Sequence, residues 1–179
     1  MRISIAAAAA FVAVLAGADQ VSAQKLADAP AVDLAAAVGD VGPGWRKQAS
    51  GDEGMTFVCD NDACGGRGVL GVGQATASPD YVRQVIADPD RMLASYRYGS
   101  EESMKPSGCA FTKFDVRRSG ERRVQYTSVG ECPEGGHAAM TTIFDAGKPF
   151  MMSVQVLSGS ETAAVTLRDK TAAKIEAAL

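Results

Sequence analysis

Four arginines gather at one predicted turn of this chain and are its clearest candidates for binding chemistry. They are Arg117, Arg118, Arg122 and Arg123, with Lys113 a few residues before them. Guanidinium groups this close together repel one another unless they are solvated or meet an anion. The pattern therefore indicates contact with a phosphate, a polymer carboxylate or an acidic protein surface. The competing interpretation is a solvated turn in which Asp115 and Glu121 are local counter-charges.

A second cluster of polar side chains points more weakly to chemistry. Glu131 and Glu134 lie close in sequence to His137, the only histidine. A metal could use these side chains, but the intervening proline and glycines favour a flexible loop, and a tight site needs more ligands held rigidly. We predict no metal site and no cofactor.

Enzymatic chemistry finds little support in the residue types. A nucleophile activated by a base would have to use His137, which lies in a glycine-rich loop. Cys59 and Cys64 are too far apart in sequence for a CxxC redox motif. The sequence therefore favours a protein that is not an enzyme.

The cysteines indicate two disulfide bonds. All four, Cys59, Cys64, Cys109 and Cys132, follow an N-terminus typical of export, and an even count in an exported chain predicts a disulfide framework. Three pairings are possible. The local pairing, Cys59–Cys64 with Cys109–Cys132, is favoured because each pair brackets a predicted turn.

Residues 1–23 have the features of a secretory signal peptide. A positive start at Arg2 precedes an apolar run from Ile3 to Gly17, and Val21-Ser22-Ala23 fits a cleavage site. The run is shorter than the about 20 residues that cross a bilayer. We predict a periplasmic or secreted protein without a membrane span in the mature chain. The formal net charge of −3 gives no general attraction to nucleic acid, so no nucleic-acid partner is expected.

Turn signals and hydrophobic spacing predict the elements that must position these groups. An N-terminal strap, residues 24–44, contains a short helix that begins at Asp33 and ends at Gly39. Later helices begin at Ser78 and Asp88, the second ending at Gly99, and a long closing helix begins within the capping residues Ser158-Gly159-Ser160-Glu161. Alternating residues predict strands over Met55–Asp60, Val69–Ala75, Ala138–Asp145 and Phe150–Leu157, besides the two arms of the arginine-bearing hairpin.

The arginine-bearing hairpin runs from Cys109 to Cys132. Keeping its apolar residues on one face of the sheet requires a loop with an odd number of residues. The three-residue loop Arg118-Ser119-Gly120, with Gly120 in the left-handed conformation, satisfies this requirement. In that register Cys109 faces Val129, so a Cys109–Cys132 bridge requires a bend at Gly130.

The predicted fold class is α+β, with a mostly antiparallel sheet in the order ββ-α-ββββ-α and a single domain over residues 45–179. This order of elements resembles the Mog1/PsbP-like fold, over about Trp45 to Leu179. That family includes binding and assembly proteins that are not enzymes, so the resemblance implies a non-enzymatic role and carries no functional residue across.

The leading functional hypothesis is a small exported binding or accessory protein of the periplasm that contacts an acidic partner through the basic hairpin tip. The partner would be a protein or an anionic envelope polymer, and the sequence leaves the oligomeric state open. One alternative is a secreted inhibitor or immunity-type protein that uses the disulfide-held loop Asn61–Gly66. A second alternative is a cell-envelope hydrolase.

Overall fold

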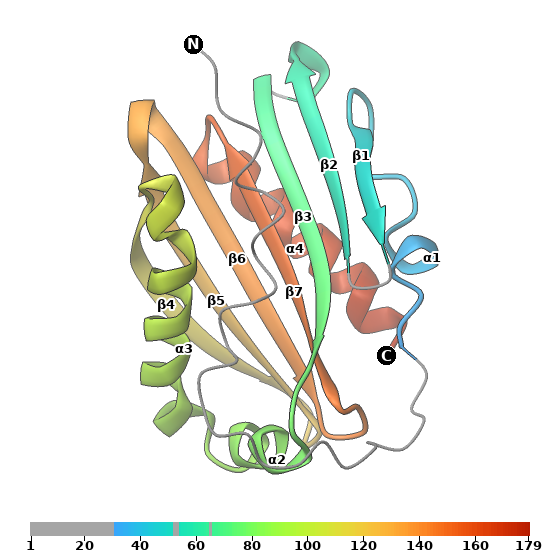
Figure 1. Cartoon of the computed structure of the whole chain (residues 1–179), viewed down its shortest axis with the longest axis vertical. Helices are drawn as coiled ribbons and strands as arrows, with labels where there is room; N and C mark the ends of the chain where they lie inside the picture. The colour runs from blue at the N-terminus through green and yellow to red at the C-terminus, as the bar shows by residue number, and fades with distance from the viewer. Residues whose placement is uncertain (1–30, 52–53, 65) are drawn as a thin grey trace.

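A computed structural model describes residues 31–179, apart from residues 52–53 and 65 (Figure 1). The predicted signal peptide and its cleavage site lie outside the described residues. Within them, no helix combines the length and apolarity that crossing a lipid bilayer requires.

The strands of the described residues join in one antiparallel sheet of seven, in the order β1-β2-β3-β7-β6-β5-β4. Their bounds are β1 Arg46–Gly51, β2 Gly54–Asn61, β3 Gly66–Thr76, β4 Ala110–Ser119, β5 Arg123–Cys132, β6 Gly136–Asp145 and β7 Phe150–Ser158. The predicted α+β class with a mostly antiparallel sheet is confirmed. β1 and β4 form its two edges.

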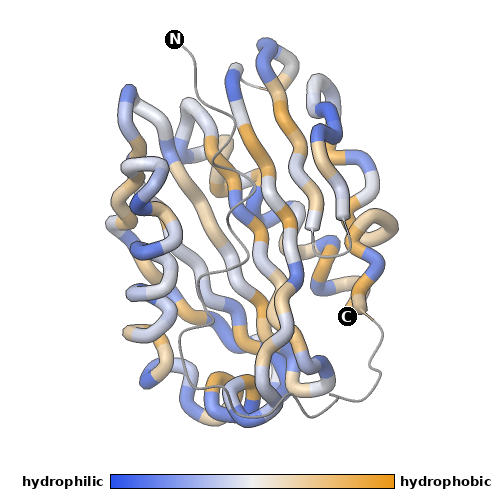
Figure 2. The backbone as a smooth tube through the Cα atoms, viewed as in Figure 1, coloured by the Kyte–Doolittle hydropathy of each residue, from blue (hydrophilic) through white to orange (hydrophobic). Residues whose placement is uncertain are grey.

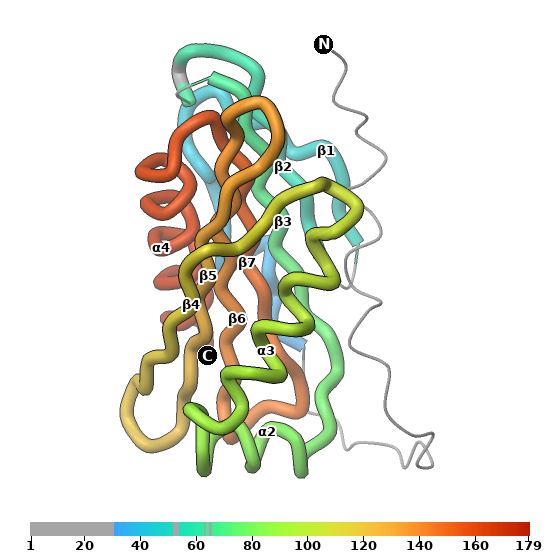
Figure 3. The backbone as a smooth tube through the Cα atoms, turned by 90° about the vertical axis from the view of Figure 1, so that its left-hand side faces the viewer, coloured from blue at the N-terminus to red at the C-terminus, as the bar shows by residue number. Residues whose placement is uncertain are grey.

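Helices cover both faces of this sheet. α4 (Glu161–Ala177) packs on β6 and β7, whereas α2 (Pro79–Ala87) and α3 (Pro89–Met104) lie on the opposite face, over β4 to β6 (Figures 1 and 3). Hydrophobic residues are frequent along β2 and β3 (Figure 2), and in β2 burial alternates from Met55 to Cys59, as expected for a strand with one buried face. The core beneath α4 includes Leu70, Val154 and Ile175, which are fully buried.

The predicted helix starts are confirmed by their caps. Asp33, Ser78 and Ser160 accept hydrogen bonds from the first turns of α1 (Leu34–Val38), α2 and α4. The predicted end of the second mid-chain helix at Gly99 is wrong, because α3 continues to Met104. Met104 is fully buried, so tertiary packing outweighs the low helix propensity of one glycine.

The edge strand β1 was not predicted. Its sequence, RKQASG, lacks alternation because every side chain is exposed, and so no apolar face marks it as a strand. Trp45, which directly precedes it, is partly buried against the core. The indole lies against Gly68, where a Cβ would come within 2.9 Å of the ring.

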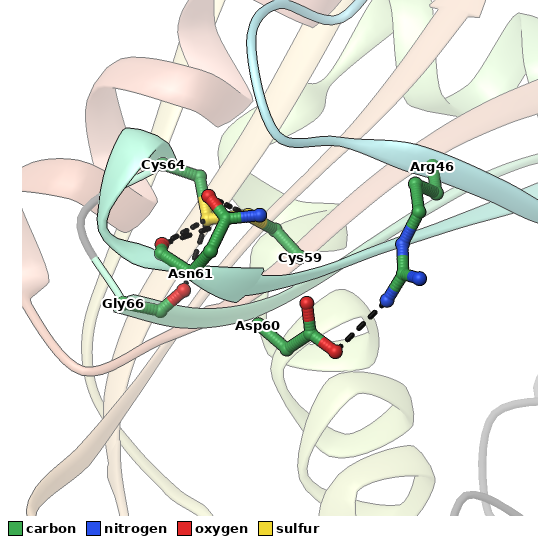
Figure 4. The surroundings of a disulfide bond; sticks show 6 residues. All are labelled: Arg46, Cys59, Asp60, Asn61, Cys64 and Gly66. Carbon is green, nitrogen blue, oxygen red and sulfur yellow. Dashed lines mark hydrogen bonds and ion pairs between the residues drawn. A yellow bond between two sulfur atoms is a disulfide. The ribbon is translucent and has the colours of Figure 1, made fainter.

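Both predicted disulfides are present. Cys59–Cys64 closes the ring after β2, where the carbonyl oxygens of Asn61 and Gly66 lie 3.0 and 2.9 Å from Cys64 Sγ (Figure 4). These are contacts rather than hydrogen bonds, because a disulfide sulfur has no hydrogen to donate. The second bridge, Cys109–Cys132, joins the two arms of the arginine-bearing hairpin.

The predicted register of that hairpin is wrong, and with it the predicted bend at Gly130. The strands close at Ser119 and Arg123, so the three-residue loop is Gly120 to Arg122 and begins with the left-handed glycine. A bulge between Phe111 and Lys113 then shifts the pairing so that Ala110 faces Glu131.

With this pairing the two cysteines follow directly at the end of the ladder. Their Cα atoms are 4.0 Å apart. Gly130 lies inside the ladder opposite Phe111 rather than at a bend.

Candidate binding site

The basic hairpin tip, defined here as Arg117 to Arg123, projects at the end of the molecule where α2 lies (Figure 3). It packs against the β6–β7 turn, since the Ala146 N–H donates to the Arg122 carbonyl at 2.8 Å. The structure therefore brings the tip together with the end of β6 and with the C-terminal end of α4.

Arg123 is held on all sides by protein groups. Its Nε and Nη2 donate to Asp145 Oδ2 at 3.2 and 3.0 Å, and Nη1 donates to the carbonyl of Glu176 at 3.1 Å. A guanidinium at the C-terminal end of a helix also interacts favourably with the helix dipole. Only 19% of the side chain is exposed. Arg123 is thus a structural clamp that joins β5, β6 and α4.

Asp145 is the counter-charge of the tip. Its side chain is 7% exposed, and besides Arg123 it accepts the Gly147 N–H on Oδ1 at 2.8 Å. Arg122 also approaches Oδ1, at 3.5 Å. Both carboxylate oxygens therefore have a closer partner than Arg122.

Arg122 remains largely in solvent, with 72% of its side chain exposed. Its guanidinium lies across Gly147, where any Cβ would collide with Nη2. The β6–β7 turn therefore positions this arginine, and glycine is the residue that allows the close approach.

The other two tip arginines diverge onto opposite faces of the sheet. Arg117 donates to Gln125 and lies 3.8 Å from a carboxylate oxygen of Glu176 on α4. Arg118 instead donates to the carbonyl of Ala87, which ends α2, at 3.2 Å. Both side chains are exposed, but the four predicted site residues do not form one continuous cluster.

A pocket of about 230 Å³ opens beside the tip. It is lined by Ser119, Arg122, Arg123, Asp145 and Leu179. The guanidinium groups of Arg122 and Arg123 and the carboxylate of Asp145 lie in its wall. Of these groups, the exposed Arg122 guanidinium is the one that can meet an acid group from solution.

Sequence reasoning missed Asp145, Ser119 and Leu179 as parts of this site. Asp145 was predicted only as the end of a strand, and it meets the arginines only because β6 pairs with β5, which places it opposite Arg123. No comparable signal exists for Leu179, which only the packing of α4 brings to the tip.

The remaining sequence candidates lie elsewhere. Glu131 and His137 face each other on β5 and β6, but in the described part of the chain no cluster of three or more His, Cys, Asp or Glu side chains could hold a metal. Lys113 donates to Glu161 Oε1 at 2.7 Å, far from the tip along β4, and this bond lowers the pKa of Glu161.

Comparisons with known proteins leave the family open. No protein-family model and no curated protein sequence matches the chain. Among solved structures, a STAR-related lipid transfer protein fragment from Xanthomonas axonopodis aligns with 75% of this chain and 96% of its own, at 10% identity and a TM-score of 0.26. Human StAR-related lipid transfer protein 5 aligns with 75% of this chain and 84% of its own, at 10% identity and a TM-score of 0.27. Likeness at this level supports no conclusion about function.

Proposed function

We propose that the protein is an exported, non-enzymatic binding or accessory protein that contacts an acidic partner through the basic hairpin tip. The observation that carries the proposal is Arg122, an exposed guanidinium beside a pocket in which the Asp145 carboxylate already has closer partners. Arg117 and Arg118 add exposed positive charge on either side. Two disulfides favour an oxidising compartment such as the periplasm.

The partner we favour is an acidic protein surface. The tip arginines point to both faces of the sheet, so a partner would have to wrap around the turn, and a folded protein with separated carboxylates can do this. Exposed charges that meet in this way contribute mainly to association rate and to selection of partner, and they are screened by salt.

A pull-down from a periplasmic extract at low and high salt tests the proposal. We expect specific capture at low salt that weakens sharply at high salt and disappears with a combined Arg118→Glu and Arg122→Glu change. A matched control is Arg46→Glu, an exposed arginine on the opposite edge strand that pairs with Asp60. Capture that is insensitive to salt, or lost equally in the control, would contradict a role for the tip.

The same pull-down distinguishes the proposed contact through the tip from the inhibitor alternative, in which the disulfide-held ring makes the contact. Asp62 is exposed on the disulfide-held ring at Asn61–Gly66. If Asp62→Arg abolishes capture while the tip variant retains it, the ring rather than the tip is the contact surface. Capture of a carbohydrate or phosphate polymer in place of protein would replace the favoured partner class.

A further inference from the structure

We propose that the pocket beside the tip is a subsite for one carboxylate or phosphate group, and that Arg122 is the residue that binds it. This inference rests on the proposed function, because it names the chemistry by which the tip would hold its partner. It assigns different roles to two neighbouring arginines that the sequence alone treats as equivalent.

Arg123 is unavailable to a ligand. Each of its three guanidinium nitrogens already contacts Asp145 or the carbonyl of Glu176. Withdrawing it would leave the nearly buried Asp145 carboxylate short of its main partner, which is costly in a poorly solvated place. An incoming anion cannot recruit Arg123 without opening the junction of β5, β6 and α4.

Arg122 can leave Asp145 at little cost. Its contact with Oδ1 is 3.5 Å, beyond good hydrogen-bond length, and the same oxygen already accepts the Gly147 N–H at 2.8 Å. The Arg122 side chain is 72% exposed, so water also solvates its guanidinium and weakens this long contact. An anionic ligand that accepts a shorter charge-assisted hydrogen bond from Arg122 therefore replaces Asp145 as its partner.

The position of Arg122 is prepared in advance by the backbone. Its carbonyl is tied to the Ala146 N–H, and its guanidinium rests across Gly147. Preorganisation of this kind lowers the conformational entropy that binding would otherwise cost.

The pocket has both the room and the polar groups that an acid group needs. The pocket volume of about 230 Å³ is far above the roughly 10–15 Å³ that one water needs. Ser119 offers a hydroxyl, Arg123 adds positive charge behind Asp145, and Leu179 forms the remaining wall. Carboxylate and phosphate share the acceptor chemistry that suits this wall.

Arginine Nε–Hε NMR signals of the protein, followed during titration at constant ionic strength, test the inference. The probes are inorganic phosphate and acetate in separate arms, with sodium chloride as the reference salt. We expect the Arg122 signal, identified by its loss in Arg122→Gln, to shift saturably with at least one probe while the Arg123 signal does not. The two arms show which acid group the pocket prefers.

Two variants make the test specific. Gly147→Ala keeps every charge but displaces the flexible end of Arg122, and it should weaken binding of the probe about tenfold, as should Arg122→Gln. Arg97→Gln, which removes an exposed arginine on α3, should leave binding unchanged.

Several outcomes would overturn the subsite. These are the absence of saturation with both probes, equal shifts of all exposed arginines, or full affinity in Arg122→Gln. Salt-sensitive capture of an acidic protein despite such a result would leave the proposed function intact. Saturable probe binding without capture of an acidic protein would support the subsite and contradict the proposed function.

Discussion

Arg122 and Arg123 show that residue type and sequence position do not decide the role of a charged side chain. Arg123 faces inward from the first residue of β5 and meets Asp145 and the end of α4. Arg122 is the last residue of the turn and remains exposed. Four arginines within seven residues are visible in the sequence, but which of them is a clamp follows only from tertiary contacts.

Removing each arginine in turn should separate the two roles. We expect Arg123→Gln to lower the free energy of unfolding by about 3 kcal/mol, because it leaves the nearly buried Asp145 without its charged partner. Arg122→Gln should change it by less than about 0.5 kcal/mol, as surface substitutions usually do. Urea unfolding of both variants measures this. Equal losses would mean that the two arginines share the clamp.

Ionisation of the Tyr126 hydroxyl makes the stability of the folded state depend on pH in the alkaline range. Burial raises the pKa of its hydroxyl, which donates to the carbonyl of Pro89 at 2.9 Å. The folded state therefore favours the neutral phenol. Its contribution is fully present below the unfolded pKa of about 10 and is lost as the pH rises towards the folded pKa.

We therefore expect stability to fall as the pH rises above about 10, and to fall less steeply in Tyr126→Phe. That variant should also lose about 1 kcal/mol at neutral pH with the hydrogen bond to Pro89. Urea unfolding at several alkaline pH values checks both points. An unchanged slope in Tyr126→Phe would mean that other groups govern the alkaline limit.

At the scale of secondary-structure elements, the sequence predicts the helices and strands that are marked by a local residue pattern. Caps at Asp33, Ser78 and Ser160 mark helix starts, and alternation marks β6 and β7. β1 lacks a signal because none of its side chains is buried, and the bulge at Phe111/Lys113 lacks one because it depends on pairing with β5. The wrong hairpin register follows from that bulge and from placing the loop two residues early.

Gly130 offers a direct test of the observed register. A Cβ there would lie 2.8 Å from the Phe111 Cα, within rigid backbone, so we expect Gly130→Ala to cost about 1–3 kcal/mol. Gly71→Ala is the matched control, since Gly71 lies in β3 with nothing within 4 Å of its Cβ position. Thermal unfolding compares the two. A tolerated Gly130→Ala would favour the register in which Gly130 lies at a bend.

At the scale of the whole molecule, the sheet carries helices on both faces, and both disulfides lie at the end of the sheet opposite the tip. The clamp at Arg123 ties α4 to the tip end of the sheet, whereas Cys109–Cys132 closes the opposite end of the same hairpin. The Arg123 contacts and the Cys109–Cys132 bridge therefore lie at opposite ends of β4 and β5. Stability and binding should consequently respond to different changes.

The disulfides test this separation. The bridges span 23 and 5 residues of sequence. The chain-entropy relation gives about 3.4 kcal/mol for the longer loop and about 2.1 kcal/mol for the shorter. We expect the Cys109→Ser/Cys132→Ser pair to lose more unfolding free energy than the Cys59→Ser/Cys64→Ser pair. Because neither bridge touches the tip, both folded variants should keep the Arg122 response to phosphate or acetate. Loss of that response in a variant that is still folded would show that the hairpin transmits strain along its length.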